Sequence, residues 1–125
     1  MIAGGPKPVA PFSHAVETDG FVFVTGQMPD TPGAPGQLPD GIEAQTRAVM
    51  ENLRLVLKGI DLDFEDVVMA RIYLTRFKQD YAAVNKTSRS YLAEGRLPAQ
   101  TCDVTGLAYD ALIEIDLICR RPADR

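Results

Sequence analysis

The feature that most constrains the fold is residues 111–119 (ALIEIDLIC), where apolar side chains recur at every second position. This period is typical of a β-strand, because successive side chains point to opposite faces of a sheet. One face would carry Ile113, Ile115, Leu117 and Cys119. The other would carry Leu112, Glu114, Asp116 and Ile118. Two carboxylates among aliphatic side chains suit a subunit interface that leaves a cleft. The alternative is that Glu114 and Asp116 are ordinary solvent-facing strand residues.

Two stretches have the periodicity of amphipathic helices. Within residues 41–59, apolar side chains recur at intervals of three and four and form one stripe. Asp40 and Glu43 have the spacing of a capping box, and Gly59 is placed to end the helix in a left-handed conformation. A second helix is predicted over residues 80–93. Its buried face is expected to carry Tyr81, Val84, Tyr91 and Leu92.

Aromatic and β-branched segments predict strands between and after the helices. They lie at residues 21–25, 67–74, 100–107 and 111–119. The short connection between the last two segments predicts a hairpin. Two amphipathic helices can cover only one face of such a sheet, so the expected fold is a two-layer α+β sandwich with one uncovered sheet face.

Length and composition fit a single domain over residues 1–125. The proline- and glycine-rich residues 28–41 are expected to form a surface loop, because too little chain precedes them to bury a core. Apolar residues make up 46% of the chain, which argues against disorder, and no apolar run approaches the ~20 residues of a membrane helix. The net charge of -4 disfavours a nucleic-acid partner. Residues 1–12 lack a secretory pattern, so we expect a cytoplasmic protein with reduced thiols.

Few residues offer nucleophilic or metal chemistry. His14 is the only histidine, and Cys102 and Cys119 are far apart in the sequence, so neither a metal site nor a Ser/His/Asp triad is expected. A buried structural role is the ordinary expectation for both cysteines. Alternation places Gln100 and Cys102 on one side of their strand, but it does not say whether that side meets Glu114.

Several short motifs follow one another along the chain. They are PFSHAV at 11–16, FVFVTGQMP at 21–29, NL at 52–53, Tyr81, VN at 84–85, LPA at 97–99 and IEID at 113–116. As an ordered set they resemble the RidA/YjgF family of reactive-intermediate deaminases over essentially the whole chain. The resemblance implies a chorismate-mutase-like fold with a mostly six-stranded mixed sheet. It also implies a homotrimer whose sheets form a central barrel, with no metal or organic cofactor and no membrane partner. Its three inter-subunit clefts would hydrolyse enamines and imines, such as 2-aminoacrylate, to 2-keto acids and ammonia.

The resemblance also carries functional positions to this chain, residue by residue. The expected catalytic residues are Glu114, which would position water, with Cys102 and Thr25. The expected substrate-binding residues are Phe12, Ser13, Gly26, Asn85 and Gln100. Phe12 keeps the ring of a cleft tyrosine but lacks its hydroxyl. Gln100 stands where deaminating members have an arginine that clamps the substrate carboxylate.

Glutamine at position 100 should weaken carboxylate binding. An arginine fork makes two charge-assisted hydrogen bonds worth roughly 1.5–3 kcal/mol each, whereas an amide donor contributes about 1 kcal/mol. The deficit is on the order of 2–5 kcal/mol, or about 30-fold to several-thousand-fold in affinity. We therefore expect weak or no activity on 2-aminoacrylate-type substrates, unless Arg71 or Arg96 reaches the cleft.

The same replacement bears on Glu114. Without a guanidinium nearby, burial should raise the pKa of this carboxyl, which suits general acid/base catalysis. The alternative is that Glu114 only forms hydrogen bonds across the trimer.

Two functions follow from these expectations. One is an enzyme that hydrolyses an enamine, imine or related molecule not anchored by a carboxylate. The other is a non-catalytic trimer that binds a small metabolite. Ribonuclease activity, attached to some relatives by name, does not fit the negative charge and the lack of a basic aromatic patch.

Overall fold

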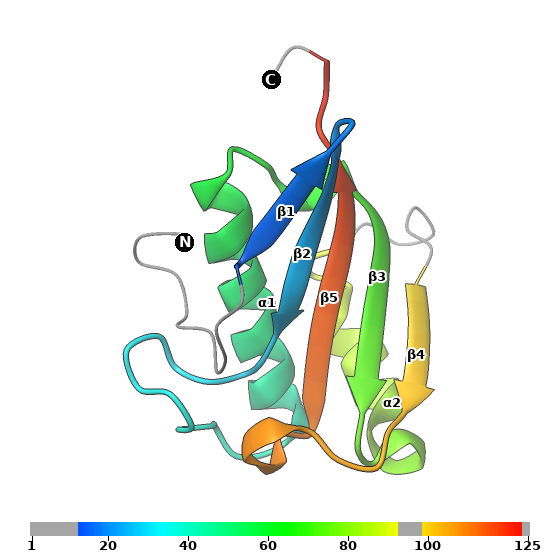
Figure 1. The fold of residues 1–125 in the computed structure, drawn as a ribbon. Helices are drawn as coiled ribbons and strands as arrows, with labels where there is room; N and C mark the ends of the chain where they lie inside the picture. The colour runs from blue at the N-terminus through cyan, green and yellow to red at the C-terminus, as the bar shows by residue number, and fades with distance from the viewer. Residues whose placement is uncertain (1–12, 93–98, 124–125) are drawn as a thin grey trace.

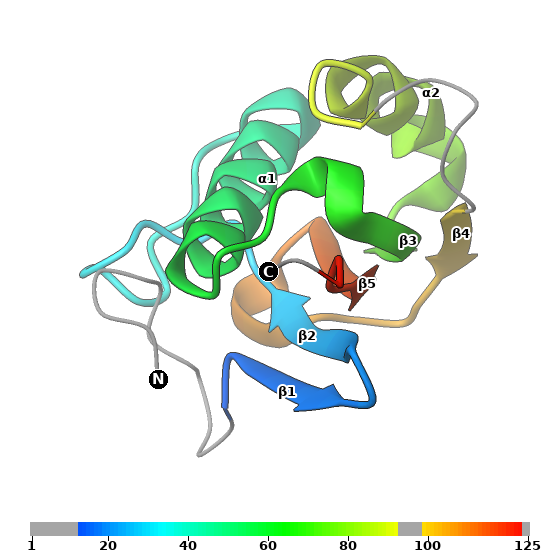
Figure 2. The ribbon, with the colours of Figure 1, turned by 90° about the horizontal axis from the view of Figure 1, so that it is seen from above.

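A computed structural model describes residues 13–92 and 99–123, which form one five-stranded sheet with two helices on the same side of it (Figure 1; Figure 2). The strands are β1 (Ala15–Thr18), β2 (Phe21–Gln27), β3 (Val67–Leu74), β4 (Ala99–Asp103) and β5 (Ile113–Arg120). The helices are α1 (Ile42–Gly59) and α2 (Phe77–Ser88). The predicted two-layer α+β fold is confirmed. The described residues supply five of the six expected strands.

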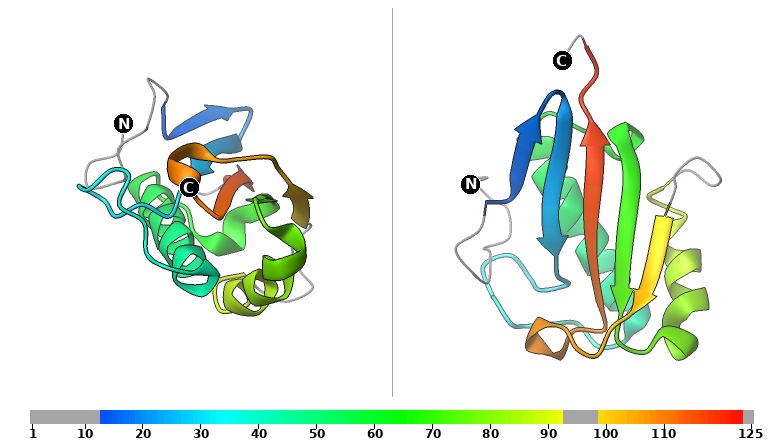
Figure 3. Two further views of the ribbon diagram at one scale, coloured as in Figure 1. Left: turned by 90° about the horizontal axis from the view of Figure 1, so that it is seen from below. Right: turned by 45° about the vertical axis from the view of Figure 1, so that its right-hand side comes forward.

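The last strand along the chain lies in the middle of the sheet. The strand order is β1-β2-β5-β3-β4, so β5 pairs antiparallel with both β2 and β3 (Figure 3). The predicted hairpin between the last two strands is wrong, because β4 pairs in parallel with β3 at the sheet edge and ends at Asp103. Burial explains the arrangement: β5 has a fully apolar inner side, whereas β4 has no buried residue. The apolar strand therefore takes the interior position and the polar strand the edge.

Helix α1 packs its apolar stripe on the sheet, as predicted. Its buried apolar residues are Val49, Met50, Leu53, Val56 and Leu57. The predicted helix ends are wrong. Gly41, with φ 87°, is the residue that precedes the helix, so Asp40 lies one position too early and no side chain caps the first turn. At the other end, Gly59 is still helical, and the left-handed residue is Asp61, with φ 58°.

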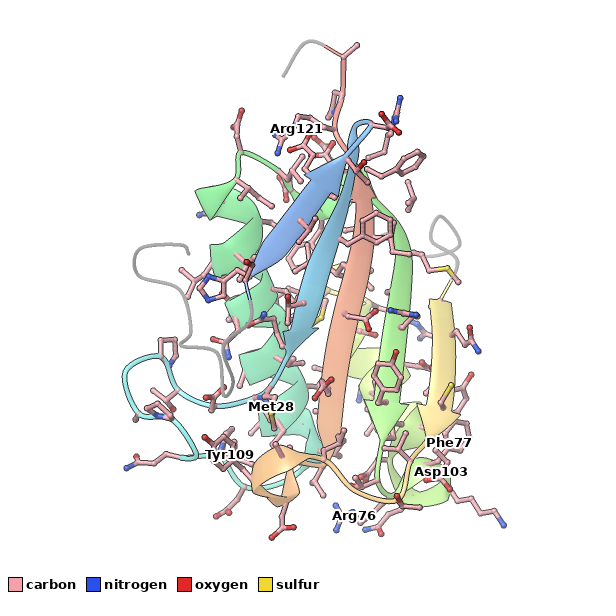
Figure 4. The ribbon with its side chains drawn as sticks, in the orientation of Figure 1. Met28, Arg76, Phe77, Asp103, Tyr109 and Arg121 are labelled. Carbon is pink, nitrogen blue, oxygen red and sulfur yellow. The ribbon has the colours of Figure 1, made fainter. Side chains whose placement is uncertain are left out.

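Helix α2 begins at Phe77 (labelled in Figure 4) rather than at residue 80, and it ends at Ser88 rather than at residue 93. Asp80 is 2% exposed inside the helix and accepts a hydrogen bond from Arg76 Nε at 3.2 Å. Val84 follows four residues later on the same face and is fully buried. Tyr81, predicted to be buried, is instead 42% exposed and stacks on the Phe77 ring. No helix in the described part of the chain is both long and apolar enough to cross a bilayer.

The loop over residues 28–41 lies beside α1, at the lower left of Figure 1. Asn52 Nδ2 donates to the backbone oxygens of Met28 and Asp30, both at 2.8 Å, and all three residues are buried. Gln45 Nε2 donates to Pro39 O at 3.0 Å. In Figure 1 the loop does not cross in front of β5, β3 or β4, so it leaves that part of the sheet uncovered.

Candidate functional site

The side of the sheet away from the helices, called the open face below, is exposed in this single chain (Figure 2). Strand β5 runs through its middle and alternates as predicted. The inward residues Ile113, Ile115, Leu117 and Cys119 are 0–2% exposed. The open-face residues, all partly exposed, are Glu114, Asp116 and Ile118.

Strand register arranges the open face in rows. Arg71 on β3 lies opposite Asp116 on β5 and opposite Gln100 on β4. The next row contains Glu114, Tyr73 and Cys102. The register therefore places the Gln100 and Cys102 side of β4 on the same face as Glu114, which the sequence pattern left open. We call these six residues the polar cluster.

Beyond the polar cluster, the open face carries a group of apolar side chains, which ends where Arg120 lies over the Phe21 ring. Ile118 lies opposite Phe23 on β2 and Met69 on β3, and Phe23 lies opposite Val16 on β1. Val16 is 60% exposed, Phe23 44% and Phe21 41%. We call the set Val16, Phe21, Phe23, Met69 and Ile118 the apolar rows. Neighbouring exposed apolar side chains of this kind are typical of interaction surfaces.

Within the polar cluster, Arg71 and Asp116 form a two-pronged ion pair. Arg71 Nε donates to Asp116 Oδ1 at 2.7 Å, and Arg71 Nη2 donates to Asp116 Oδ2 at 3.1 Å. Tyr73 Oη donates to Asp116 Oδ2, also at 3.1 Å. Burial and the nearby Asp116 carboxylate raise the pKa of Tyr73, so its hydroxyl keeps the proton that it donates. Arg71, the arginine that could replace the missing carboxylate-binding arginine of position 100, thus lies beside Gln100. Its guanidinium, however, is already bound to Asp116.

Glu114 lies at the edge of the cluster nearest to β2, and its carboxylate is against the backbone of that strand. A Cβ atom on Gly26 would come within 2.5 Å of Glu114 Oε2, so only glycine lets the carboxylate approach this closely. Burial, with a smaller contribution from the negative charge of Asp116, raises the pKa of Glu114. The predicted direction of this shift is confirmed. A carboxyl with a raised pKa is a stronger base when ionised, so it is better suited to accept a proton and then return it.

A β-bulge brings the Gly26 backbone to this position. The pairing of β2 with β5 shifts between Val24 and Gln27, and the bulge contains Thr25 and Gly26. The Thr25 hydroxyl donates to the backbone oxygen of Ser13, and its backbone N–H donates to His14 O at 2.9 Å. Ser13, the first described residue, and Thr25 therefore lie together, next to Gly26.

The remaining predicted site residues are placed differently. Asn85 lies on α2, in the layer on the other side of the sheet from the open face (Figure 2). Phe12 and Arg96 lie outside the described residues. Gln100 Nε2 is 3.8 Å from Cys102 Sγ on the exposed edge strand. Cys119 is fully buried in the core, where burial raises the pKa of its thiol to about 11.

The helix side offers a different hollow of about 320 Å³. It is lined by Arg54, Leu57, Lys58, Leu62, Asp63 and Phe64. Arg54 is occupied there, because it lies over the Phe64 and Tyr91 rings and pairs with Glu51. None of the predicted site residues lines this hollow. Among the described residues, no three His, Cys, Asp or Glu side chains are grouped to hold a metal ion.

Reasoning from the sequence missed the roles of Tyr73 and Asp116 in the cluster. Their contacts depend on β3 lying beside β5 in a particular register, and no local pattern specifies that pairing. One available signal was the alternation of Arg71 and Tyr73 with buried Ile72 and Leu74 in β3, which indicates that the two polar residues share the open face.

Comparison with known proteins gives consistent matches over the whole chain. The family model described as Endoribonuclease L-PSP matches residues 3–120. A RutC family protein of Synechocystis is 34% identical over 122 residues, covering 96% of this chain and 93% of the relative. A RutC family protein of Pyrococcus horikoshii is 33% identical over 113 residues, covering 90% and 89%. The crystal structure of RidA from an Antarctic Psychrobacter superposes with a TM-score of 0.86 at 26% identity, covering 94% of each chain.

Proposed function

The chain belongs to the RidA/YjgF family, and from that membership we propose that it is a cytoplasmic homotrimer whose clefts hydrolyse a small enamine or imine. The observation that carries this proposal is the Glu114 carboxyl. It is half-buried on an otherwise uncovered sheet face, it lies against the Gly26 backbone, and its pKa is raised. Such a group is suited to acid/base chemistry on a neutral ligand.

The apolar rows support assembly on the open face. Val16, Phe21 and Phe23 are at least 41% exposed in the single chain, and a neighbouring copy would bury them. The polar cluster lies on β5, β3 and β4, next to Ile118 and Met69 of the apolar rows, so assembly would enclose it at the edge of the interface. Sites between subunits commonly combine apolar walls with a few polar groups of this kind.

Glu114 would act as the proton carrier of the reaction. Its carboxylate accepts a proton from the water molecule that attacks the C=N carbon, and the resulting carboxyl returns this proton to nitrogen. This gives a carbinolamine. The Glu114 carboxylate then accepts the remaining proton from the carbinolamine hydroxyl and passes it to nitrogen as the C–N bond breaks, so that ammonia leaves and a carbonyl product remains. Thr25, whose hydroxyl proton is directed to Ser13 O, offers oxygen lone pairs to a substrate N–H or to water, and Cys102 lies one strand beyond Tyr73.

The remaining contacts would come from the substrate-binding positions. These are Phe12, Ser13, Gly26 and Gln100. Asn85 would have to come from a neighbouring subunit, because it lies on α2, on the other side of the sheet from the polar cluster of its own chain. Gln100 offers a neutral amide where a carboxylate would need a cation, and the nearby Arg71 is paired with Asp116. We therefore propose weak or no activity on 2-aminoacrylate-type substrates and better activity on imines that a carboxylate does not anchor.

The test is a coupled assay in which 2-iminobutyrate is generated enzymatically and keto-acid formation is followed. Wild type, Glu114→Ala and Gln100→Arg are compared, with Glu65→Ala as a control because Glu65 is an exposed carboxylate in the turn before β3. We expect little acceleration by wild type and the control, and a clear gain in Gln100→Arg. Strong acceleration by wild type with no gain in Gln100→Arg would contradict the role given to position 100.

A non-catalytic trimer that binds a metabolite is the second candidate. It is favoured by the same pairing of Arg71 with Asp116, since that pairing leaves the polar cluster without an unpaired cation. Inactivity of every variant toward both acidic and uncharged imines, together with a ligand-dependent rise in Tm, would support this second function.

A further inference from the structure

The guanidinium of Arg71 is already occupied by a carboxylate of the same chain. Each Asp116 oxygen accepts one N–H of Arg71, at 2.7 and 3.1 Å, in the side-on geometry with which an arginine binds a carboxylate ligand. Asp116 is well fixed in this position, because its side chain is only 14% exposed and Tyr73 donates to it as well. Its partner Arg71 is 49% exposed on the open face.

The charges of the polar cluster follow from this pairing. Asp116 compensates Arg71, and Gln100, opposite Arg71 on β4, is neutral. Glu114 then adds either no charge or one negative charge, according to its protonation. A ligand carboxylate entering the cluster would have to displace Asp116 from the arginine or lie beside a second carboxylate without a cation of its own. An uncharged ligand meets neither obstacle.

We propose that Asp116 determines ligand specificity: by occupying the Arg71 fork, it makes the site select uncharged imines and carbonyl compounds and reject their carboxylate counterparts. The inference rests on the proposed function in one respect, since it takes the open-face cluster to be the ligand site. It goes further by naming the residue responsible and the ligand charge that it selects.

The experiment measures the affinities of two probes of equal size, pyruvate and pyruvamide, for the assembled protein by calorimetry or ligand-observed NMR. Wild type is expected to bind pyruvamide at least tenfold more tightly than pyruvate. Asp116→Ala frees the arginine and is expected to tighten pyruvate binding about tenfold or more, with pyruvamide affinity within about threefold of wild type. Adding Arg71→Met to this variant should abolish the gain.

Two further variants keep the test decisive. Asp116→Asn preserves the shape of the side chain and removes its charge, so it should shift the preference toward pyruvate even if Asp116→Ala folds poorly. Glu65→Ala removes a distant negative charge and should leave the preference unchanged, which separates the local fork from the net charge of the protein.

The outcomes distinguish this inference from the function on which it rests. A wild-type preference for pyruvate, or an unchanged preference in folded Asp116→Ala and Asp116→Asn, overturns the inference and leaves the proposed function standing. Failure of wild type and every variant to bind either probe overturns both, because the open face would then not be a ligand site.

Discussion

The backbone of Gly26 lies directly against the carboxylate of Glu114, so that a Cβ on the glycine would come within 2.5 Å of Oε2. The contact joins the bulge of β2 to the start of β5, where the proposed proton carrier is located. Because Gly26 has no side chain, the carboxylate lies directly against the β2 backbone. This backbone therefore limits how deeply a ligand can enter on that side.

Gly26→Ala should therefore impair catalysis much more than stability. The carboxylate can move away from a methyl group by rotating, but a displacement of about 1 Å at a catalytic group costs about 100-fold in rate. The measurement is kcat on an uncharged imine, with Tm as the check on folding. Gly106→Ala is the matched control, because a Cβ there meets no atom within 4 Å and the rate should not change. Equal rates for Gly26→Ala and wild type would rule out this placement of Glu114.

Phe23→Glu should break the assembly. Phe23 is 44% exposed in the apolar rows, and a charge at this position would be buried without a partner when copies associate. Sedimentation velocity should give a trimer for wild type and a smaller species for the variant at micromolar concentration. Tyr81→Glu is the control: Tyr81 is exposed to a similar extent, 42%, but lies on α2, so the trimer should persist. A monomeric wild type would contradict the proposed assembly.

Asn52→Ala should destabilise the fold by about 2–4 kcal/mol, because two buried backbone oxygens of the 28–41 loop lose their donor. Urea unfolding followed by circular dichroism measures the change. Leu55→Ala, at a 40% exposed position of the same helix, should have a much smaller effect. A similar loss in both variants would mean that the two hydrogen bonds contribute little.

Glu114→Gln should change how stability depends on pH. Burial raises the pKa of Glu114 in the folded chain above its ordinary value of 4.5. Between the ordinary and raised pKa values the folded chain binds more protons than the unfolded one, so the wild type loses stability as pH rises through that window. Glutamine does not titrate and avoids this loss. The variant's free energy of unfolding relative to wild type should therefore be more favourable at pH 7 than at pH 4.

The control for this prediction is internal. The pKa of buried Asp30 is also raised by burial, but Asp30 is present in both proteins, so its contribution cancels in the difference. Denaturation curves at four pH values between 4 and 7 measure that difference. If it is the same at every pH, Glu114 is not desolvated in the folded protein.

Local periodicity was enough to predict both helices and four of the five described strands, but not β1 or the order in which the strands pair. The apolar stripe of α1 and the alternation of β5 reflect which side chains each element buries, and both are legible in the sequence. The position of β5 between β2 and β3 depends on contacts between residues far apart in the chain. The short separation of β4 from β5 favoured a hairpin, and the greater burial available at the centre of the sheet outweighed it.

The residues of the candidate site were likewise predictable only in part. Glu114, Gly26, Gln100 and Cys102 could be proposed from motifs. The roles of Arg71, Tyr73 and Asp116 could not, because their contacts arise only where β3 and β5 pair in register. A search for a cation to replace the missing arginine could identify Arg71 from the sequence. Only the geometry reveals that Asp116 already binds it.

The central place of β5 also has a consequence for how the protein folds during synthesis. Before β5 leaves the ribosome, β1 and β2 can form only an isolated two-stranded unit, and β3 with β4 another, because nothing else joins them in the sheet. Two-stranded units are marginally stable in water. The five-stranded sheet can therefore close only once β5 is available, which makes the pairing of this strand a late step in folding.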